Sequence, residues 1–237
     1  GRATGIAVGR SLRYNTRLVN LRLNGILLGD EAGRTIAQAL RLNTHLREIS
    51  LGMNELGDTS GVAIGKALQV NSSLYELDLA QNKFGAQVGR AFAAALRENK
   101  TLRVLDLSYN NLGRSVHALG QSLRFNCSLR VVKLSCTNMD SDGAQAVAVA
   151  LESNNSLVEL DLYRNNLNTA GGNAISRALK HNSSLRRLNL LQNNIDAHGI
   201  ELIKQSIQKN SALRWLELAQ QDSKTQVFEL SDVSPEP

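Results

Sequence analysis

Residues 74–84 of the chain read LYELDLAQNKF, and this stretch decides the fold. Large aliphatic residues stand at its first, fourth and sixth positions, and an asparagine stands at its ninth. Similar runs open at Leu18, Leu46, Leu74, Leu102, Leu129, Leu157, Leu185 and Leu213. Successive runs begin 28 residues apart, except that the unit at Leu102 is one residue short. A fixed period of this length is typical of a stacked solenoid.

Each unit is expected to hold one strand and one helix, with positions numbered from its first leucine. Leu77 and Leu79 lie two residues apart, so they share one face of a short strand. The amide of Asn82 can donate and accept, and we expect it to bond the loop backbone of neighbouring units. Apolar residues then recur at helical spacing at Phe84, Val88, Phe92, Ala95 and Leu96. Neither half buries its apolar face alone, so the units must stack.

One domain is expected to cover most of the chain. We predict a solenoid over residues 1–218, with a truncated first unit at 1–17, and a C-terminal capping segment with a flexible tail at 219–237. Val227, Phe228 and Leu230 are expected to cover the last apolar edge, and residues 231–237 to be disordered. Because the sequence begins with Gly1, we expect it to be a piece of a longer protein. The irregular units at 102–156 are expected to change the curvature locally.

The unit pattern Leu-x-x-Leu-x-Leu-x-x-Asn-x-Leu, followed by Gly and by Ala-Leu-x-x-Asn, resembles the leucine-rich repeat of ribonuclease-inhibitor type over residues 5 to about 218. The resemblance implies an α/β horseshoe with a concave parallel sheet and convex helices. The repeat pattern is similar to that of the repeat domains of nucleotide-binding immune receptors, of the Ran GTPase-activating protein and of ribonuclease inhibitor. The ninth-position asparagine is replaced by Ile26, Thr137 and Gln221.

Composition points to a cytoplasmic protein that does not enter a membrane. No apolar stretch approaches the roughly 20 residues that a bilayer span needs. The two cysteines, Cys127 and Cys136, form no cluster, which favours a reducing compartment. Five Asn-x-Ser/Thr triplets share one repeat position, at Asn71, Asn99, Asn126, Asn154 and Asn182. We interpret them as left-handed residues that end each helix, rather than as glycosylation sites.

Motifs that suggest chemistry fail on inspection. Asn138, Asp140, Asp142 and Gly143 imitate the start of a calcium loop, but its twelfth position is Val149 instead of a bidentate Glu. Residues 61–67 imitate a phosphate loop that is one residue short, inside an expected helix. The four histidines have no partner at ligand spacing. We therefore expect no catalytic residue, metal, cofactor or small-molecule substrate, and no enzyme.

The net charge of +6 is unevenly distributed. A cation recurs at the end of the helices, where it complements the helix dipole, at Arg13, Arg41, Arg97, Arg124 and Lys180. The exposed third, fifth and seventh positions of the strands instead carry seven carboxylates against three cations, namely Glu48, Glu76, Asp78, Asp106, Glu159, Asp161 and Glu217 against Arg22, Lys133 and Arg187. Nucleic acid should avoid such a face, because phosphate binding depends on Lys and Arg.

Four aromatic residues stand on or beside this strand face, and large amphipathic rings are common anchors of protein interfaces. We predict a recognition module that binds a partner protein through its concave face, with candidate residues Tyr75, Arg103, Asp106, Tyr109, Lys133, Glu159, Asp161, Tyr163, Arg187 and Trp215. For Trp215 the alternative is packing beneath the C-terminal segment.

By resemblance, the expected context is the sensing or regulatory repeat region of a larger protein of innate immunity, such as a nucleotide-binding immune receptor. Two alternatives remain. One is a GTPase activator of the Ran-activator type, although the strongly acidic C-terminal segment of that family is missing here. The other is a structural scaffold without a specific ligand.

Overall fold

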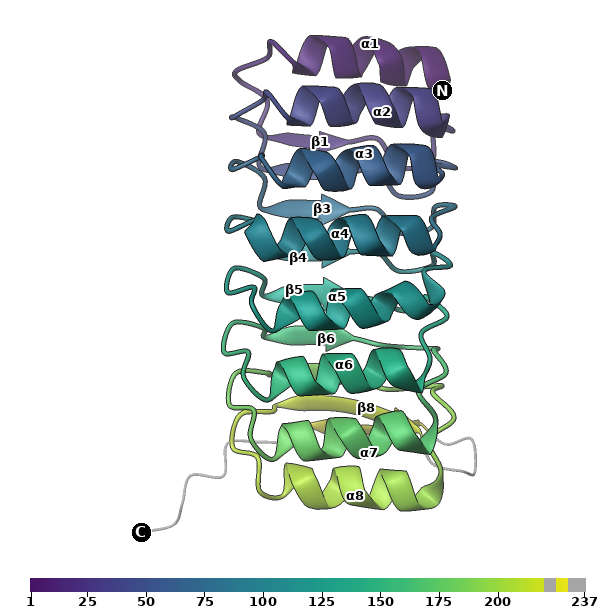
Figure 1. Ribbon diagram of the computed structural model, residues 1–237, viewed down its shortest axis with the longest axis vertical. Coiled ribbons are helices and arrows are strands. Elements are labelled where there is room, and N and C mark those ends of the chain that lie inside the picture. Colours follow the sequence, from purple (N-terminus) through teal and green to yellow (C-terminus); the bar gives the residue numbers. More distant parts are fainter. Residues whose placement is uncertain (220–224, 230–237) are drawn as a thin grey trace.

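The computed structural model describes residues 1–219 and 225–229. Strands and helices alternate along this part of the chain, one of each per unit (Figure 1). The helices are α1 (Arg2–Leu12), α2 (Gly29–Leu40), α3 (Asp58–Leu68), α4 (Ala86–Glu98), α5 (Val116–Leu123), α6 (Ser141–Leu151), α7 (Asn168–Leu179) and α8 (Ala197–Ile207), and the short 3-10 helix η1 (Gly113–Ser115) precedes α5. The strands are β1 (Asn20–Arg22), β2 (Glu48–Ser50), β3 (Glu76–Asp78), β4 (Val104–Asp106), β5 (Val131–Lys133), β6 (Glu159–Asp161), β7 (Arg187–Asn189), β8 (Trp215–Ala219) and β9 (Thr225–Glu229).

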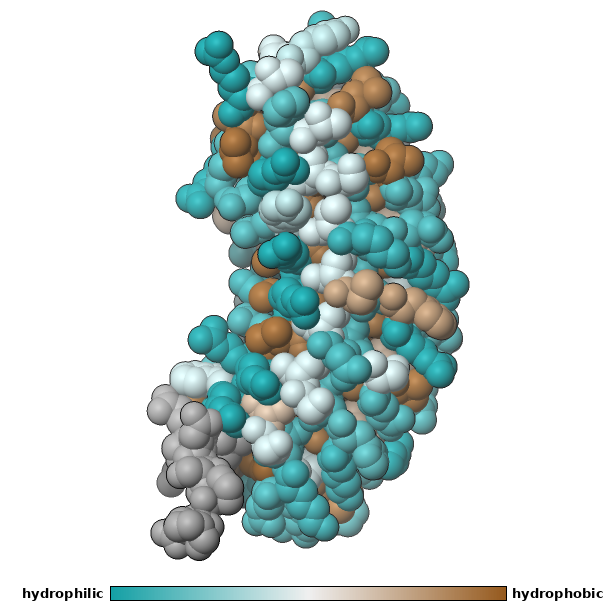
Figure 2. All heavy atoms as spheres, turned by 90° about the vertical axis from the view of Figure 1, so that its left-hand side faces the viewer, coloured by the Kyte–Doolittle hydropathy of each residue, from teal (hydrophilic) through white to brown (hydrophobic). Residues whose placement is uncertain are grey.

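The strands form one open sheet in chain order, and the helices stack in a single layer over it (Figure 1). Strands β1 to β8 are parallel, and their paired residues lie one repeat apart, as with Glu48 opposite Glu76. Across the short unit the paired residues lie one position closer in sequence, so Val104 lies opposite Val131. The sheet lines the hollow side of a curved molecule (Figure 2). The predicted α/β solenoid is therefore confirmed.

The core is the apolar layer between the strands and the helices. Leu74, Leu77 and Leu79 are fully buried beneath β3. The helical stripe of the same unit is buried too, with Phe84 and Phe92 at 0 % exposure. Burial of this aliphatic layer is the main stabilising contribution, since each large side chain removed from water contributes about 1.5–3 kcal/mol.

Asn82 forms the ladder predicted for the ninth position. Its Nδ2 donates to the backbone oxygens of Leu79 at 2.9 Å and Leu51 at 3.1 Å. Its Oδ1 accepts from the backbone N–H groups of Asn54 at 3.1 Å and Leu56 at 3.0 Å. One side chain thus satisfies backbone groups of two units, and buried groups of this kind are costly to leave unpaired.

A second asparagine ladder follows the helices, and the left-handed interpretation of it is wrong. Asn71 is 6 % exposed and does not adopt a positive φ. Its Nδ2 donates to the backbone oxygens of Leu40 at 2.6 Å and Asn43 at 3.1 Å, in the preceding unit. Its Oδ1 accepts from the backbone N–H groups of Ser73 and Leu74. Equivalent side chains are Asn43, Asn99, Asn126, Asn154, Asn182 and Asn210.

Aspartates cap several helices. Helix α3 begins after Gly57, which has no side chain, and Asp30 of the preceding helix accepts from the N–H groups of Gly57 at 2.9 Å and Ser60 at 3.0 Å. Burial raises the pKa of Asp30, but the hydrogen bonds from Ser60 and Gly57 outweigh it and lower the pKa overall. Asp140 accepts from Gly143 at 3.0 Å, so the calcium-like motif is an N-cap of α6. The loop-like residues 61–67 lie within α3, as predicted.

The short unit at Leu102 differs from the others in its helix, and the unit that follows it differs in its ladder. Helix α5 has eight residues, where the other helices have 11 to 13. Thr137 replaces the next asparagine, and its hydroxyl donates to Leu134 O at 2.9 Å within its own unit. Thr137 lacks the bond to the preceding unit that Asn110 makes to Leu79 O. One rung is therefore missing here, while the change of curvature stays a prediction.

At the C-terminal end, β9 pairs antiparallel with β8 and occupies the edge that stacking leaves open. Phe228 is half-buried against the core, and Val227 is 48 % exposed. Leu230 and residues 231–237 lie outside the described residues. The division of the chain at residue 219 stays a prediction.

Candidate functional site on the concave face

Exposed side chains of the strands form parallel rows along the concave face. Because the strands pair one repeat apart, equal positions of neighbouring units lie side by side, about 4.8 Å apart. In the fifth-position row, Lys133 is paired with Asp106 on one side and Asp161 on the other. This row reads Asp78, Asp106, Lys133, Asp161, Asn189 and Glu217.

A hollow of about 460 Å³ lies over the middle of these rows. It brings together five of the predicted residues, namely Asp106, Tyr109, Lys133, Asp161 and Tyr163. Ala80, Gln81, Ser108, Ser135, Asn189, Leu191 and Glu217 complete its lining. We call it the central hollow.

A smaller hollow of about 210 Å³ adjoins the central hollow toward β8. It contains three further predicted residues, Glu159, Arg187 and Trp215, and shares Asp161 with the central hollow. Arg187 and Glu159 form an ion pair at 3.5 Å. The indole Nε1 of half-buried Trp215 donates to Glu217 Oε1 at 3.1 Å. Both hollows therefore belong to one surface.

Tyr75 and Arg103 lie apart from this surface. They occupy the second position of their units, before the strands begin, and line neither hollow. The guanidinium groups of Arg47 and Arg103 lie 5.2 Å and 5.1 Å from the centre of the Tyr75 ring. These cation–π contacts supply a structural role for both residues.

Local hydrogen bonds explain why several aspartates recur on the concave face. The Oδ1 atoms of Asp78, Asp106 and Asp161 each accept from the backbone N–H two residues later, at 2.9–3.0 Å. Asn189 does the same. This Asx-turn geometry satisfies the N–H at the strand end. Sequence reasoning missed it, although Asp or Asn at four of the eight fifth positions was the available signal.

Burial raises the pKa of Asp106, and the like charge of Asp78 adds to this. The hydrogen bonds from Ser108 and the positive charge of Lys133 oppose the shift without cancelling it. The carboxylate of Asp106 is therefore less stable here than in water. A cationic group that entered the central hollow would favour its ionised form.

Ser135 is the one described side chain of the central hollow with a buried polar atom that lacks a partner. Lys133 cannot accept a hydrogen bond, so the N–H of Ser135 instead donates to Ser108 Oγ at 3.3 Å. Ser135 is 4 % exposed, and its own hydroxyl meets no acceptor within the described residues. A buried unpaired hydroxyl is uncommon, and here it stands in the wall of the candidate site.

Tyr109 stands at the rim, at the eighth position of its unit, where Met53, Gln81, Cys136, Arg164 and Gln192 also have a positive φ. Its φ is 57°, in the left-handed region that non-glycine residues rarely adopt. Its N–H donates to Ser135 O at 2.7 Å, and its side chain is 47 % exposed. Cys136 holds the pKa of the phenol above its ordinary value, with some help from desolvation. The fold therefore presents this ring to solvent beside the central hollow.

Within residues 1–219 and 225–229, no three His, Cys, Asp or Glu side chains are arranged to hold a metal ion. Both cysteines are free thiols. None of the described helices combines the length and the hydrophobicity that a membrane crossing requires. What the surface offers is an ordered set of carboxylates, cations and aromatic rings on a stacked sheet.

Comparisons with known proteins agree with the repeat pattern. A family model described as "Leucine Rich repeat" matches residues 42–65, 98–114, 125–148, 153–176 and 181–204. No curated protein sequence matches the chain. Two similar solved structures are "Leiomodin-1 Actin-Binding Site 2 (ABS2)", at 15 % identity over 87 % of both chains with a TM-score of 0.41, and a tropomodulin C-terminal domain of Caenorhabditis elegans, at 13 % identity over 87 % of this chain and 92 % of that chain with a TM-score of 0.41. The matched segments and the stacked strand–helix units show a leucine-rich repeat fold, whose units resemble those of ribonuclease-inhibitor type.

Proposed function

We propose that the chain is a non-enzymatic recognition module that binds a partner protein with its concave face. Leucine-rich repeats are typical of protein-interaction modules, and the curved stack provides an extended surface. The observation that supports this assignment most strongly is the central hollow, where Asp106, Tyr109, Lys133, Asp161 and Tyr163 meet. A sheet held by buried ladders loses little entropy on docking, so its contacts contribute directly to affinity.

The charge of the face indicates the chemistry of the partner. Its carboxylates outnumber its cations, and the pKa of Asp106 is raised by burial and by Asp78. We infer that the partner presents a basic segment, and that one of its Arg or Lys side chains enters between Asp106 and Asp161. Lys133 between these carboxylates selects against a uniformly cationic segment, because like charges repel.

The cellular context follows only from resemblance. We propose that the chain is the sensing or regulatory repeat region of a larger cytoplasmic protein, such as a nucleotide-binding immune receptor. The Ran-activator alternative makes a different prediction. It requires that the chain accelerate phosphate release from a GTPase, whereas a recognition module leaves that rate unchanged.

The test is affinity capture from cell extract with the intact chain and with a Tyr109→Ala, Tyr163→Ala variant. We expect the variant to retain at least about tenfold less of the captured partner, since buried aromatic anchors dominate interfaces. A Val19→Ala, Leu27→Ala variant is the control, because it removes two exposed apolar side chains that line neither hollow of the concave face. Unchanged capture by the concave variant, or equal loss in both variants, contradicts the proposal.

A further inference from the structure

Large apolar side chains recur where the helices end. Tyr14, Leu42, Val70 and Phe125 each lie two residues beyond the last residue of a helix. Their exposed fractions are 77 %, 54 %, 59 % and 59 %, so they do not pack into the core. We call these four residues the helix-end ridge. Figure 2 faces the edge of the stack where the helices end, and it shows apolar patches among hydrophilic atoms there.

Six exposed cations flank this ridge on α1 to α5, and Glu98 is the one carboxylate at the same helix ends. They are Arg10, Arg13, Arg41, Lys66, Arg97 and Arg124. None of these side chains makes a hydrogen bond or an ion pair with the part of the chain that the structure describes. Arg13 stacks on Tyr14 at 5.4 Å, and Arg97 stacks on Phe125 at 5.8 Å.

The helix dipole accounts for part of this arrangement only. A cation near a helix C-terminus is favourable, which explains one such residue per helix. It does not explain why a large apolar side chain directly follows the cation after α1, α2 and α5 and stays in water. Exposed apolar residues that gather within a polar rim mark interaction sites.

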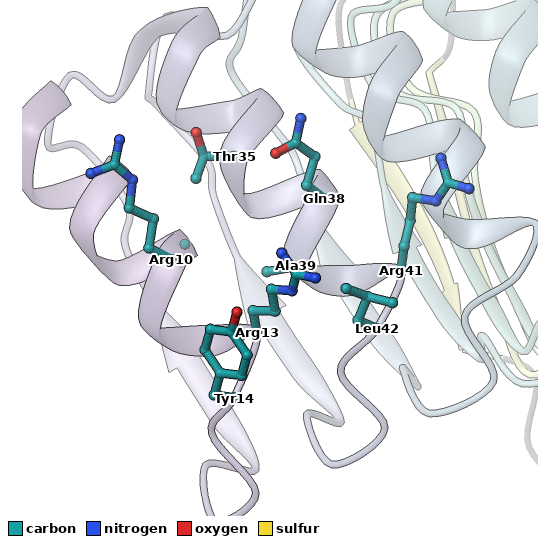
Figure 3. A pocket seen from close by; sticks show the side chains of 9 residues that line it. Arg10, Arg13, Tyr14, Thr35, Gln38, Ala39, Arg41 and Leu42 are labelled. Carbon is teal, nitrogen blue, oxygen red and sulfur yellow. The ribbon is translucent and has the colours of Figure 1, made fainter.

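A hollow of about 610 Å³ lies between the ends of α1 and α2 (Figure 3). Arg10 and Arg41 stand on either side of it, and Arg13 extends from α1 toward Ala39 and Leu42. Gly9, Tyr14, Thr35 and Gln38 complete the lining, which contains no carboxylate.

A second hollow of about 510 Å³ repeats this composition farther along the stack. Arg97 and Arg124 flank it, and Phe125 and Val149 are its large apolar residues. His117, Gln121, Gln145, Ala146 and Ala150 complete the lining, again without a carboxylate. The two hollows thus pair arginines with an exposed aromatic ring in the same way.

We propose that the helix-end ridge is a second docking surface and that it binds an acidic segment of a partner protein. Apolar side chains of this segment enter the two hollows, and its carboxylates pair with the flanking arginines, whose planar groups match a carboxylate well. This surface is independent of the concave face, which has the opposite charge. Two separate hollows fit individual side chains better than they fit a continuous lipid surface.

The probe is a fluorescein-labelled helical peptide of about 30 residues, with Leu and Phe on one face and Glu on the other, long enough to reach both hollows. We expect the intact chain to bind this peptide with a micromolar dissociation constant. Binding should weaken as the salt concentration rises. Arg13→Glu with Arg41→Glu should weaken binding at least about tenfold, and so should Leu42→Ser with Val70→Ser. All four residues are exposed, so these variants should fold.

Charge reversal on α7 is the matched control, with Arg177→Glu and Lys180→Glu. Lys180 has the repeat position of Arg13 and Arg41, but His181 replaces the large apolar neighbour. We expect this variant to keep the peptide affinity within about twofold, because only the ridge combines charge with apolar side chains. Tyr109→Ala with Tyr163→Ala should also leave it unchanged, which separates this proposal from the concave-face proposal.

Several results would overturn the proposal. They are no binding by the intact chain, equal loss in the α7 control, and equal affinity for a peptide with Lys in place of Glu. Binding of phosphatidylserine vesicles that requires Arg13 and Arg41, without peptide binding, would assign the ridge to membranes. Sedimentation that shows self-association lost in the Arg13→Glu, Arg41→Glu variant, again without peptide binding, would assign it to a second copy of the chain.

Discussion

The ninth-position asparagine ladder and the concave face lie in the same units, but the first keeps the same residue from unit to unit and the second does not. Ladder positions hold the same residue in most units, because each side chain must bond the backbone of its neighbour. The third position of the units faces solvent and varies along the stack, where it holds Glu76, Val104, Glu159, Arg187 and Trp215. The difference teaches that repetition secures the stack, and that variation on the exposed rows is where specificity can reside.

The fifth position lies between these extremes. Asp78, Asp106 and Asp161 repeat because each one satisfies a backbone N–H. Lys133 breaks the pattern at the centre of the sheet, and Ser135 beside it keeps a buried hydroxyl without a partner. A departure that weakens local hydrogen bonding inside the central hollow is the strongest sign that this row serves binding as well as folding.

The largest expected effect is on the ladder. Asn165→Ala removes an Oδ1 that accepts from the N–H groups of Thr137 and Met139, both at 3.0 Å, and an Nδ2 that donates to Leu134 O at 2.8 Å. Each buried group left unpaired costs about 1–3 kcal/mol, so we expect the free energy of unfolding to fall by about 3 kcal/mol or more. Urea unfolding followed by circular dichroism measures it.

Asn166→Ala is the control for this experiment. Asn166 is exposed, its φ is negative, and within the described residues its side chain bonds the Asn194 side chain, at 3.0 Å. We expect a change within about 0.5 kcal/mol. Equal destabilisation by both variants would mean that the ladder does not hold the stack.

A smaller effect is expected at the cap between α2 and α3. Asp30→Ala removes the acceptor of two N–H groups, so we expect a loss of about 1 kcal/mol at neutral pH. The folded state lowers the pKa of Asp30, so this stabilisation exists above its unfolded pKa of about 4 and is lost as pH falls through the folded pKa. Unfolding midpoints of the two proteins should therefore converge in acid. A constant difference down to acidic pH would contradict the cap.

On the concave face, removing a charge should stabilise the fold slightly. Asp106→Asn keeps the acceptor for the N–H of Ser108 but removes a carboxylate whose pKa is raised by burial. A raised acid pKa means that stability falls as pH rises through it, so we expect the variant to be more stable at pH 7 by less than about 1 kcal/mol. The advantage should vanish in acid, where wild-type Asp106 is protonated. Thermal unfolding across pH measures the sign, and destabilisation at pH 7 would contradict it.

The smallest effect is expected at the rim. Arg187→Ala breaks the ion pair with Glu159, in which the Arg187 side chain is 67 % exposed. Exposed pairs contribute little, so we expect a change below about 0.5 kcal/mol in unfolding free energy. A loss comparable to that of Asn165→Ala would erase the distinction between the two regions.

Sequence reasoning predicted what depends on the period, and missed what depends on distant partners. The buried leucines, the helical stripe at Phe84 and the Asn82 ladder follow from spacing alone, and all are confirmed. The Asn71 ladder was misread, because left-handed propensity is local whereas its bonds reach the preceding unit. The place of Tyr75 between Arg47 and Arg103, away from Tyr109, depends on contacts with the two neighbouring units, which spacing within one unit does not specify.

The most direct test of the account is the affinity of the captured partner for an Asp106→Asn, Asp161→Asn variant, which keeps both backbone caps and removes only charge. Asp142→Asn with Glu201→Gln is the matched control, because both carboxylates are exposed on helices and belong to neither proposed surface. We expect at least about tenfold weaker binding for the concave variant and a change within about twofold for the control. Equal affinity of the concave variant and the wild-type chain would contradict the assignment of recognition to the concave face.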